Sequence, residues 1–250
     1  MKLLIAIPSR YNAERLPGKP LVDLAGEPMI HHVWRRAMEA ADRMPPHIQT
    51  TVVVATDHLA IAESVRSIGG KAVITKEEHL SGTSRCREAL DLMDSEGFGP
   101  FDLIINLQGD EPLANPDHMV TLAQSSASLA SLYTPSTNPE EWNNPAHCFV
   151  VVNAAGHAQY FSRFSLPYQR TEHEAPKYRH LGLYAYAPSV LRAVVNLPQA
   201  PNEKAESLEQ LRWLHHGFTL EMCCVENAFG GVDTPEDVAH FDVLLRKRRP

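Results

Sequence analysis

Residues 3–21 read LLIAIPSRYNAERLPGKPL, a run of five apolar residues followed by a polar loop. The run is bounded by Pro8, and its bulky aliphatic side chains predict a buried strand. In open α/β sheets, ligands bind at the loops that follow the carboxyl ends of the strands. Pro17, Gly18 and Pro20 predict that no helix forms in this loop. The loop is therefore a candidate ligand-binding segment.

The loop carries three cations, Arg10, Arg15 and Lys19, at a spacing too irregular for one face of a helix. It lacks the glycine pattern of a dinucleotide-binding fingerprint, and no Ser or Thr follows its lysine as in a Walker loop. One interpretation is a site for a polyanion held by side-chain charge, with a phosphate chain as the first candidate. The alternative is a solvated loop whose cations pair with nearby carboxylates such as Glu14 and Asp23.

The bulk properties narrow the class of protein. A chain of 250 residues suits one large α/β domain, with or without an insertion. The net charge of −7 argues against general binding to nucleic acid or to a membrane surface, since both need a dominant positive field. Four cysteines without a CxxC pair, a short apolar start and the lack of a run of about 18 apolar residues predict a soluble cytoplasmic protein. The thirteen histidines have no H-x-x-x-H spacing, so we expect no structural zinc site.

Strand and helix patterns alternate through the first half of the chain, which is typical of a doubly wound parallel sheet. Strands are expected at 3–7, 51–55, 71–75 and 101–107, with helices between them. Asp57 is expected to cap the helix after the second strand. From about residue 129 the pattern changes to strand-like pieces separated by long polar loops, which favours mixed or antiparallel structure. These pieces are 129–133, 148–153, 181–186 and 219–225, with helices at 207–217 and from 231 to the basic tail.

Two aspartates are candidate metal ligands. Asp110 follows the most apolar strand and comes after Gly109, which lets backbone approach a ligand closely. A carboxylate there, across from a cationic loop, is where a divalent metal would be held. The alternative is that Asp110 caps or braces the loop. Asp233 has a stronger alternative, because Thr234 and Pro235 make a good helix start after it.

Other polar groups suit a small-molecule site. Ser81, Gly82 and Thr83 could bind a base edge or a phosphate, although a helix cap explains them equally well. His180 and Tyr184 are four residues apart in a strand-like stretch and are expected to face the same side. A set of such groups in the second half suits a carboxylated, polyhydroxylated molecule, although each is also explained as a structural polar group. The set comprises Arg163, His180, Tyr184, Glu209 and Gln210.

Nine motifs follow one another along nearly the whole chain. They are Ile7-Pro8-Ser9-Arg10-Tyr11, Arg15-Leu16-Pro17-Gly18-Lys19-Pro20-Leu21, Ala55-Thr56-Asp57, Ser81-Gly82-Thr83, Gln108-Gly109-Asp110-Glu111-Pro112, Tyr160-Phe161-Ser162-Arg163, His180-Leu181-Gly182-Leu183-Tyr184, Leu208-Glu209-Gln210-Leu211-Arg212 and Gly231-Val232-Asp233-Thr234-Pro235-Glu236-Asp237. In this order they resemble the motifs of the 3-deoxy-manno-octulosonate cytidylyltransferase family. The resemblance implies one nucleotidyltransferase domain over 1–250, with an inserted region at about 129–226 for sugar-acid binding and dimerisation. It also implies a doubly wound, mostly parallel α/β sheet of the sugar nucleotidyltransferase type, with mixed α+β structure in the insertion.

The resemblance also implies an activity and its site. The family transfers a cytidylyl group from CTP to the anomeric hydroxyl of 3-deoxy-D-manno-octulosonate (Kdo), releases pyrophosphate for lipopolysaccharide synthesis, needs Mg²⁺ and forms homodimers. The catalytic residues would be Arg10, Arg15, Lys19 and Asp110. The nucleotide would contact Arg10, Arg15, Lys19, Ser81, Gly82 and Thr83. The metal would contact Asp110 and Asp233, and the sugar acid Gln108, Arg163, His180, Tyr184, Glu209 and Gln210.

The chain departs from the family pattern at several positions. Ala13 replaces a usual serine of the phosphate loop, and Ser84 replaces an acidic residue after Ser-Gly-Thr. A usual lysine is absent around Phe149, and Ile-Pro-Trp becomes Leu-Pro-Tyr at 166–168. Three alternatives therefore stay open: a variant acid such as 8-amino-Kdo, a nucleotidylyltransferase for a sugar or alcohol without an acid group, and a non-catalytic nucleotide-binding relative.

Overall fold

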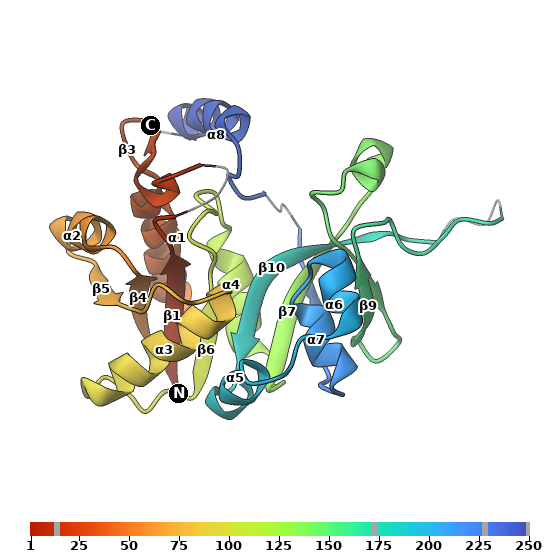
Figure 1. The fold of residues 1–250 in the computed structure, drawn as a ribbon, viewed down its shortest axis with the longest axis horizontal. Helices are drawn as coiled ribbons and strands as arrows, with labels where there is room; N and C mark the ends of the chain where they lie inside the picture. The colour runs from red at the N-terminus through yellow and green to blue at the C-terminus, as the bar shows by residue number, and fades with distance from the viewer. Residues whose placement is uncertain (13–15, 172–174, 227–229, 249–250) are drawn as a thin grey trace. The chain divides into compact units, whose positions relative to one another are not determined.

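The computed structural model describes residues 1–12, 16–171, 175–226 and 230–248, and the chain divides into two compact units (Figure 1). Unit 1 comprises Met1–Ala123 and Phe229–Pro250, and unit 2 comprises Gln124–Ala228. The inserted region predicted at about 129–226 falls within the bounds of unit 2. Both units mix helices and strands, in agreement with the predicted α/β class.

Unit 1 is built on a parallel sheet in the order β6-β1-β4-β5. Its strands are β1 (Lys2–Ser9), β4 (Gln49–Thr56), β5 (Lys71–Ile74) and β6 (Leu103–Asn106). β1 is a central strand, paired on one side with β4 and on the other with β6. Its apolar run, 3–7, is fully buried, because side chains point to the two faces of a sheet and helices α1 (Met29–Arg43) and α3 (Gly82–Ser95) pack against β1. The predicted strands of the first half are thus confirmed, with ends that differ by a few residues.

Helices pack against this sheet and support the loops at its carboxyl edge. Both α1 and α3 contact β1 and β4, and α2 (Leu59–Ser67) contacts β4 and β5. The other elements of unit 1 are the 3-10 turn η1 (Lys19–Leu21), the hairpin of β2 (Asp23–Leu24) and β3 (Glu27–Pro28), α4 (Pro116–Gln124) and α8 (Pro235–Arg248). A small apolar cluster that includes Leu24, Met29, Val232 and Phe241 packs α8 against the β2–β3 hairpin region.

Two local predictions for unit 1 are wrong. Asp57 does not cap α2: the cap is His58, whose Nδ1 accepts a hydrogen bond from the Ala60 N–H at 3.3 Å. The carboxylate of Asp57 is instead bonded elsewhere, as described below. A helical turn also forms at Lys19–Leu21, where none was expected, because Pro20 lies in its first turn and needs no N–H partner there.

The strands of unit 2 pair in both parallel and antiparallel directions, as the sequence pattern from about residue 129 predicts. β7 (Leu129–Pro135) pairs antiparallel with β10 (Tyr178–Tyr186) and parallel with β11 (Glu221–Cys224). β8 (Phe149–Val152) pairs antiparallel with both β9 (Ala158–Ser162) and β10. The remaining elements are η2 (Pro139–Asn143), α5 (Pro188–Val194), α6 (Pro201–Glu206) and α7 (Gln210–His215). The helix expected at 207–217 begins only at Gln210, because Ser207 has φ of 53° and ends α6.

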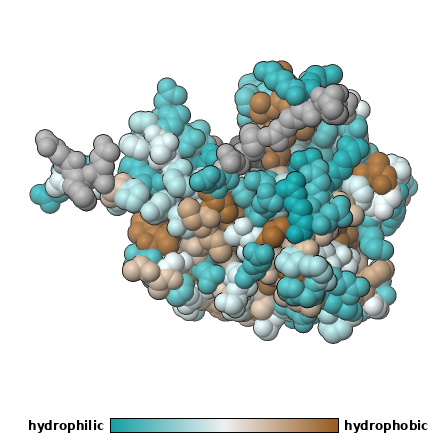
Figure 2. Space-filling view, turned by 180° about the vertical axis from the view of Figure 1, so that it is seen from behind, coloured by the Kyte–Doolittle hydropathy of each residue, from teal (hydrophilic) through white to brown (hydrophobic). Residues whose placement is uncertain are grey.

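One face of the surface is mainly hydrophilic, with hydrophobic residues in separate small patches (Figure 2). Among the described residues, no helix combines the length and the apolar character needed to cross a membrane.

Candidate active site

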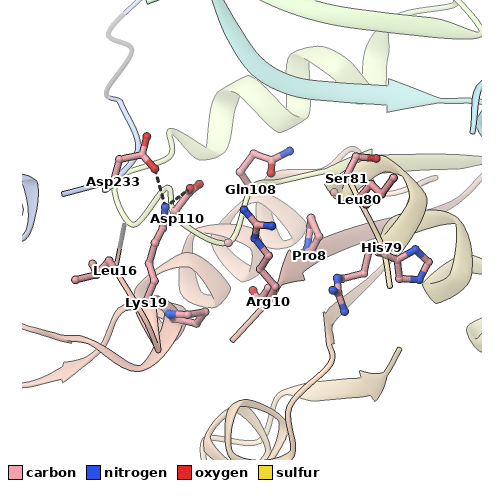
Figure 3. Close-up of a pocket in the computed structure, with 15 residues that line it drawn as sticks. Pro8, Arg10, Leu16, Lys19, His79, Leu80, Ser81, Gln108, Asp110 and Asp233 are labelled. Atoms are coloured by element: carbon pink, nitrogen blue, oxygen red, sulfur yellow. Dashed lines mark hydrogen bonds and ion pairs between the residues drawn. The ribbon is translucent and has the colours of Figure 1, made fainter. Parts of the chain in front are cut away.

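A pocket of about 300 Å³ lies in unit 1 (Figure 3). Its walls come from the end of β1, the loop before α3, the loop after β6 and the segment before α8. Parallel strands end on the same edge of a sheet, so these loops converge although they are far apart in sequence. Seven predicted site residues line the pocket: Arg10, Lys19, Ser81, Gly82, Gln108, Asp110 and Asp233.

Lys19 joins the two candidate metal ligands. Its Nζ donates to Asp110 Oδ2 at 2.6 Å and to Asp233 Oδ1 at 3.0 Å, as the dashed lines in Figure 3 mark. The lysine side chain is 12% exposed, whereas the two aspartates are 31% and 45% exposed. The Val232 N–H donates to the Asp110 carbonyl at 2.8 Å, which holds the loop after β6 beside the segment before α8. A cation therefore already sits between the two carboxylates.

The cap of α8 is made by two other residues. Thr234 Oγ1 accepts from the Asp237 N–H at 3.2 Å, and the Asp237 carboxylate accepts from the N–H groups of Asp233 and Thr234, both at 2.9 Å. Burial alone would raise the pKa of Asp237, but these backbone bonds hold that pKa below its usual value. The side chain of Asp233 bonds to Lys19 instead. Thr234 and Asp237 therefore cap α8, and the Asp233 side chain does not.

Gly109 is required by its protein neighbours. A Cβ at this position would lie 2.3 Å from Ser9 Oγ and 2.7 Å from the Pro8 carbonyl oxygen. The ends of β1 and β6 therefore approach closely at Gly109, which also lines the pocket, and its approach to a ligand stays a prediction. Glu111, which follows Asp110, has a pKa raised to about 8, because burial disfavours its charged form and Asp110 repels it.

The Ser81 end of the pocket is organised by the start of α3. Ser81 Oγ accepts from the Ser84 N–H at 3.2 Å, so Ser81 both caps the helix and lines the pocket. His79 Nδ1 is hydrogen-bonded to Ser84 Oγ at 3.1 Å, and its Nε2 is hydrogen-bonded to Glu88. Ser84, a departure from the family pattern, thus links the cap to His79. Leu80 lies beside them and is 93% exposed.

The predicted nucleotide-binding roles of two residues, Thr83 and Arg15, are not tested by the pocket lining. Thr83 is 2% exposed on the first turn of α3 and is not among the lining residues. Arg15, and with it Ala13, lies outside the described residues. Their predicted roles stay predictions.

The remaining sugar-acid candidates lie in unit 2. The ring of His180 lies 4.9 Å from that of Phe161 and 5.5 Å from that of Tyr184, and the register of β10 shifts between Leu181 and Tyr184. His180 Nε2 is hydrogen-bonded to the buried Ser131 Oγ at 2.9 Å, and burial lowers the pKa of His180 to about 3. The imidazole is therefore neutral at physiological pH. Gln210 is 4% exposed, and its Nε2 lies 3.5 Å from Cys148 Sγ.

Arg163 ties β9 to the turn between α6 and α7. Its Nε and Nη1 donate to the carbonyl oxygens of Glu206 and Pro145, both at 2.8 Å, and its Nη2 donates to that of Ser207 at 3.3 Å. Glu209 and Gln210 follow directly after this turn. The arginine is thus in a position to fix the backbone that carries these two predicted residues.

The buried His180 predicts a loss of stability in acid. Its folded pKa lies below the usual 6.5, so the unfolded chain binds the extra proton first, and stability falls as pH drops below 6.5 toward 3. Between pH 8 and pH 5 this residue is expected to reduce the free energy of unfolding by about 2 kcal/mol. Urea unfolding of the wild type and of His180→Gln at both pH values measures the contribution. An equal pH-dependent loss in the two proteins would contradict it.

Sequence reasoning missed part of the pocket. His79, Leu80 and Arg85 line it, yet none was selected as a site residue. Arg85 resembles any cation on an amphipathic helix, and only its 3% exposure distinguishes it. The signal that the sequence did offer was its position directly after Ser-Gly-Thr-Ser84.

Comparisons with known proteins show which family the chain belongs to. The family model described as cytidylyltransferase matches residues 4–222. The 3-deoxy-manno-octulosonate cytidylyltransferase of Parabacteroides distasonis is 39% identical, with 99% of this chain and 100% of that protein covered. The protein of the same name from Methylobacterium radiotolerans is 42% identical, with 98% of each chain covered. A solved structure of CMP:2-keto-3-deoxy-manno-octonic acid synthetase complexed with CTP is 37% identical, covers 100% of both chains and superposes with a TM-score of 0.89. The chain therefore belongs to the cytidylyltransferase family, and within it to the 3-deoxy-manno-octulosonate cytidylyltransferases.

Proposed function

We propose that the chain transfers a cytidylyl group from CTP to the anomeric hydroxyl of Kdo and releases pyrophosphate. The observation that carries this proposal is the cluster of Arg10, Lys19, Asp110 and Asp233 in one pocket at the end of β1. The full-length relatives bear the name of this reaction, and the similar solved structure is a complex with CTP.

The two ends of the pocket can bind the two parts of CTP, the triphosphate at one end and the cytosine at the other. Arg10 and Lys19 would bind the triphosphate, together with Arg15, because guanidinium and ammonium groups bind phosphate oxygens strongly. Ser81, Gly82 and Thr83 would lie on the cytosine side. The start of α3 suits this role, since hydroxyls and first-turn N–H groups are oriented donors there. In Figure 3, Lys19 lies beside Asp110 and Asp233, Ser81 lies at the other end, and Arg10 lies between them.

Asp110 and Asp233 fit a magnesium ion. Both offer carboxylate oxygens, which Mg²⁺ prefers, and the Lys19 ammonium between them marks a position where positive charge is stable. Among the described residues, no group of three or more His, Cys, Asp or Glu side chains could hold a metal. Two carboxylates completed by phosphate oxygens and water would suit Mg²⁺, which seldom uses an all-protein cage. When bound, the ion would neutralise charge on the phosphates and favour ionisation of the attacking hydroxyl.

The side chains of the pocket would stabilise the charge that develops during transfer. Arg10 and Lys19 would neutralise the departing pyrophosphate, and fixed positive groups in a partly buried site lower the barrier more than they would in water. No side-chain base is assigned, and the pocket would contribute mainly by holding the α-phosphate in reach of the sugar hydroxyl. The assembled Lys19, Asp110 and Asp233 favour an enzyme over a non-catalytic relative.

For the sugar acid, unit 2 supplies the candidate residues Arg163, His180, Tyr184, Glu209 and Gln210, and Gln108 in the pocket of unit 1 is a further candidate. Neutral His180 and Tyr184 would form hydrogen bonds with the sugar hydroxyls. Arg163 would then supply the positive charge that binds the carboxylate of the sugar acid. Kdo is our first choice of substrate, and 8-amino-Kdo is the alternative that the departures at Ser84 and Phe149 leave open.

We also propose a cytoplasmic homodimer that serves lipopolysaccharide synthesis. Phe164 and Tyr168 of unit 2 are 82% and 85% exposed, and aromatic side chains of this kind are enriched in protein interfaces. A second copy of the chain is the partner that the family suggests for them. The four cysteines are free, which suits a reducing compartment.

Arg163→Lys tests the sugar-acid assignment. The variant keeps the charge but loses the planar set of donors, so the KM for Kdo is expected to rise by about tenfold while that for CTP stays within a factor of about three. Steady-state pyrophosphate release measures both constants. Arg192→Lys on α5, an exposed arginine, is the matched control and should change neither. A rise in the KM for CTP alone would mean that Arg163 belongs to the nucleotide site.

A further inference from the structure

Arg85 is a buried arginine that joins three elements of unit 1. It projects from the first turn of α3 and is 3% exposed. Its Nη1 donates to Thr75 Oγ1 at 2.6 Å and to the Lys76 carbonyl at 3.2 Å, and its Nη2 donates to Asp57 Oδ2 at 2.9 Å. The planar donor fork of arginine suits such a junction. The residues after β4 and β5 are thereby fastened to the start of α3.

Asp57 extends this junction to the loop after β1. Its second carboxylate oxygen accepts from the Tyr11 N–H at 2.9 Å. The Tyr11 ring stacks on His58 with the ring centroids 3.9 Å apart. The Tyr11 carbonyl accepts from the Gly18 N–H at 3.0 Å, at a backbone with φ of 69° that favours glycine. Tyr11 is thus held by Asp57 and His58, and Gly18 is in turn held by the Tyr11 carbonyl.

The fixed points adjoin two of the cations that line the pocket, Arg10 and Lys19. Arg10 directly precedes Tyr11, and Lys19 directly follows Gly18. A buried ion pair is weak evidence for stability, since the cost of removing its charges from water offsets much of their attraction. A role in holding one conformation is the better-attested reason for such a pair.

We infer that Asp57 and Arg85 are positioning residues for triphosphate binding, a role that rests on the proposed function of the pocket. Through Tyr11 they hold Arg10 and Lys19 at the separation that a phosphate chain requires. Neither residue needs to touch the sugar acid. Their loss should therefore weaken the binding of polyphosphates selectively, because the cations would remain but would no longer be held together.

Asp57→Asn is the first test, because asparagine keeps the shape and an acceptor for the Tyr11 N–H but removes the charge that faces Arg85. The KM for CTP and the calorimetric dissociation constant of inorganic tripolyphosphate should each rise by about tenfold, with the KM for Kdo within a factor of about three. Mere destabilisation would lower the melting temperature and the active fraction but would not move these constants selectively. Asp91→Asn is the matched control, since Asp91 forms a half-buried ion pair with Arg87 on α3 and is not among the residues that line the pocket.

A second variant keeps the buried pair intact in case Asp57→Asn folds poorly. Tyr11→Ala removes the stack on His58 and should also weaken tripolyphosphate binding, whereas Tyr11→Phe should restore it. Unchanged tripolyphosphate binding in both Asp57→Asn and Tyr11→Ala would overturn the positioning role. Arg10→Ala distinguishes this failure from failure of the proposed site: if it too leaves tripolyphosphate binding unchanged, the pocket does not bind the triphosphate at all.

Discussion

Replacing Asp110 with Asn is expected to lower kcat by a factor of about 100 or more, with a small change in melting temperature. Asparagine keeps the size of the side chain and can still accept from Lys19 Nζ, but it removes the charge that a magnesium ion would need. Asp110 is also partly exposed, so loss of its ion pair should cost at most about 1 kcal/mol of stability. Pyrophosphate release and thermal unfolding measure the two effects.

Asp233→Asn should behave in the same way, because α8 is capped by Thr234 and Asp237. Asp117→Asn is the matched control for both variants. Asp117 forms an exposed ion pair with Arg43, and its replacement should leave kcat unchanged. If Asp110→Asn or Asp233→Asn lowered the melting temperature but kept full turnover per folded molecule, the role of that residue would be structural.

The grouping of Arg10, Lys19 and Asp110 in one pocket follows from the sequence by simple rules. The apolar run of β1 predicts a central strand, and the carboxyl edge of a parallel sheet gathers the loops that follow its strands. The sequence therefore predicts that Arg10, Lys19 and Asp110 lie at the same edge of the sheet. That Lys19 bonds to both Asp110 and Asp233 depends on contacts between residues far apart in the chain, which no local pattern encodes.

Capping illustrates where local patterns become ambiguous. Asp57, Asp233 and Thr234 are residue types that commonly begin helices, so the sequence favours Asp57 before α2 and does not distinguish Asp233 from Thr234 before α8. His58 is not a typical capping residue. The structure uses His58 and Thr234, which leaves Asp57 and Asp233 for Arg85 and Lys19. In both cases the carboxylate beside the cap is bonded to a distant cation.

The sugar-acid set was harder to predict because its members have strong structural explanations. His180 is buried against Ser131, and Arg163 bonds to three backbone carbonyls. Burial and fixed bonds such as these are properties of the folded chain, and the residue types alone are compatible with either role. The turn at Ser207, which shortened the predicted helix, has no glycine to mark it.

Pyrophosphate release from each nucleoside triphosphate, with and without Kdo and Mg²⁺, tests the central claim most directly. The account predicts rapid release only when CTP, Kdo and a divalent ion are all present, with CTP preferred over ATP, GTP and UTP by a factor of about 100 or more. Excess chelator should abolish the reaction, and added Mg²⁺ or Mn²⁺ should restore it, because without a divalent ion the negative charge of the phosphates is not neutralised. Equal rates with all four nucleotides, full activity in chelator, or release with a neutral sugar but none with Kdo would contradict it.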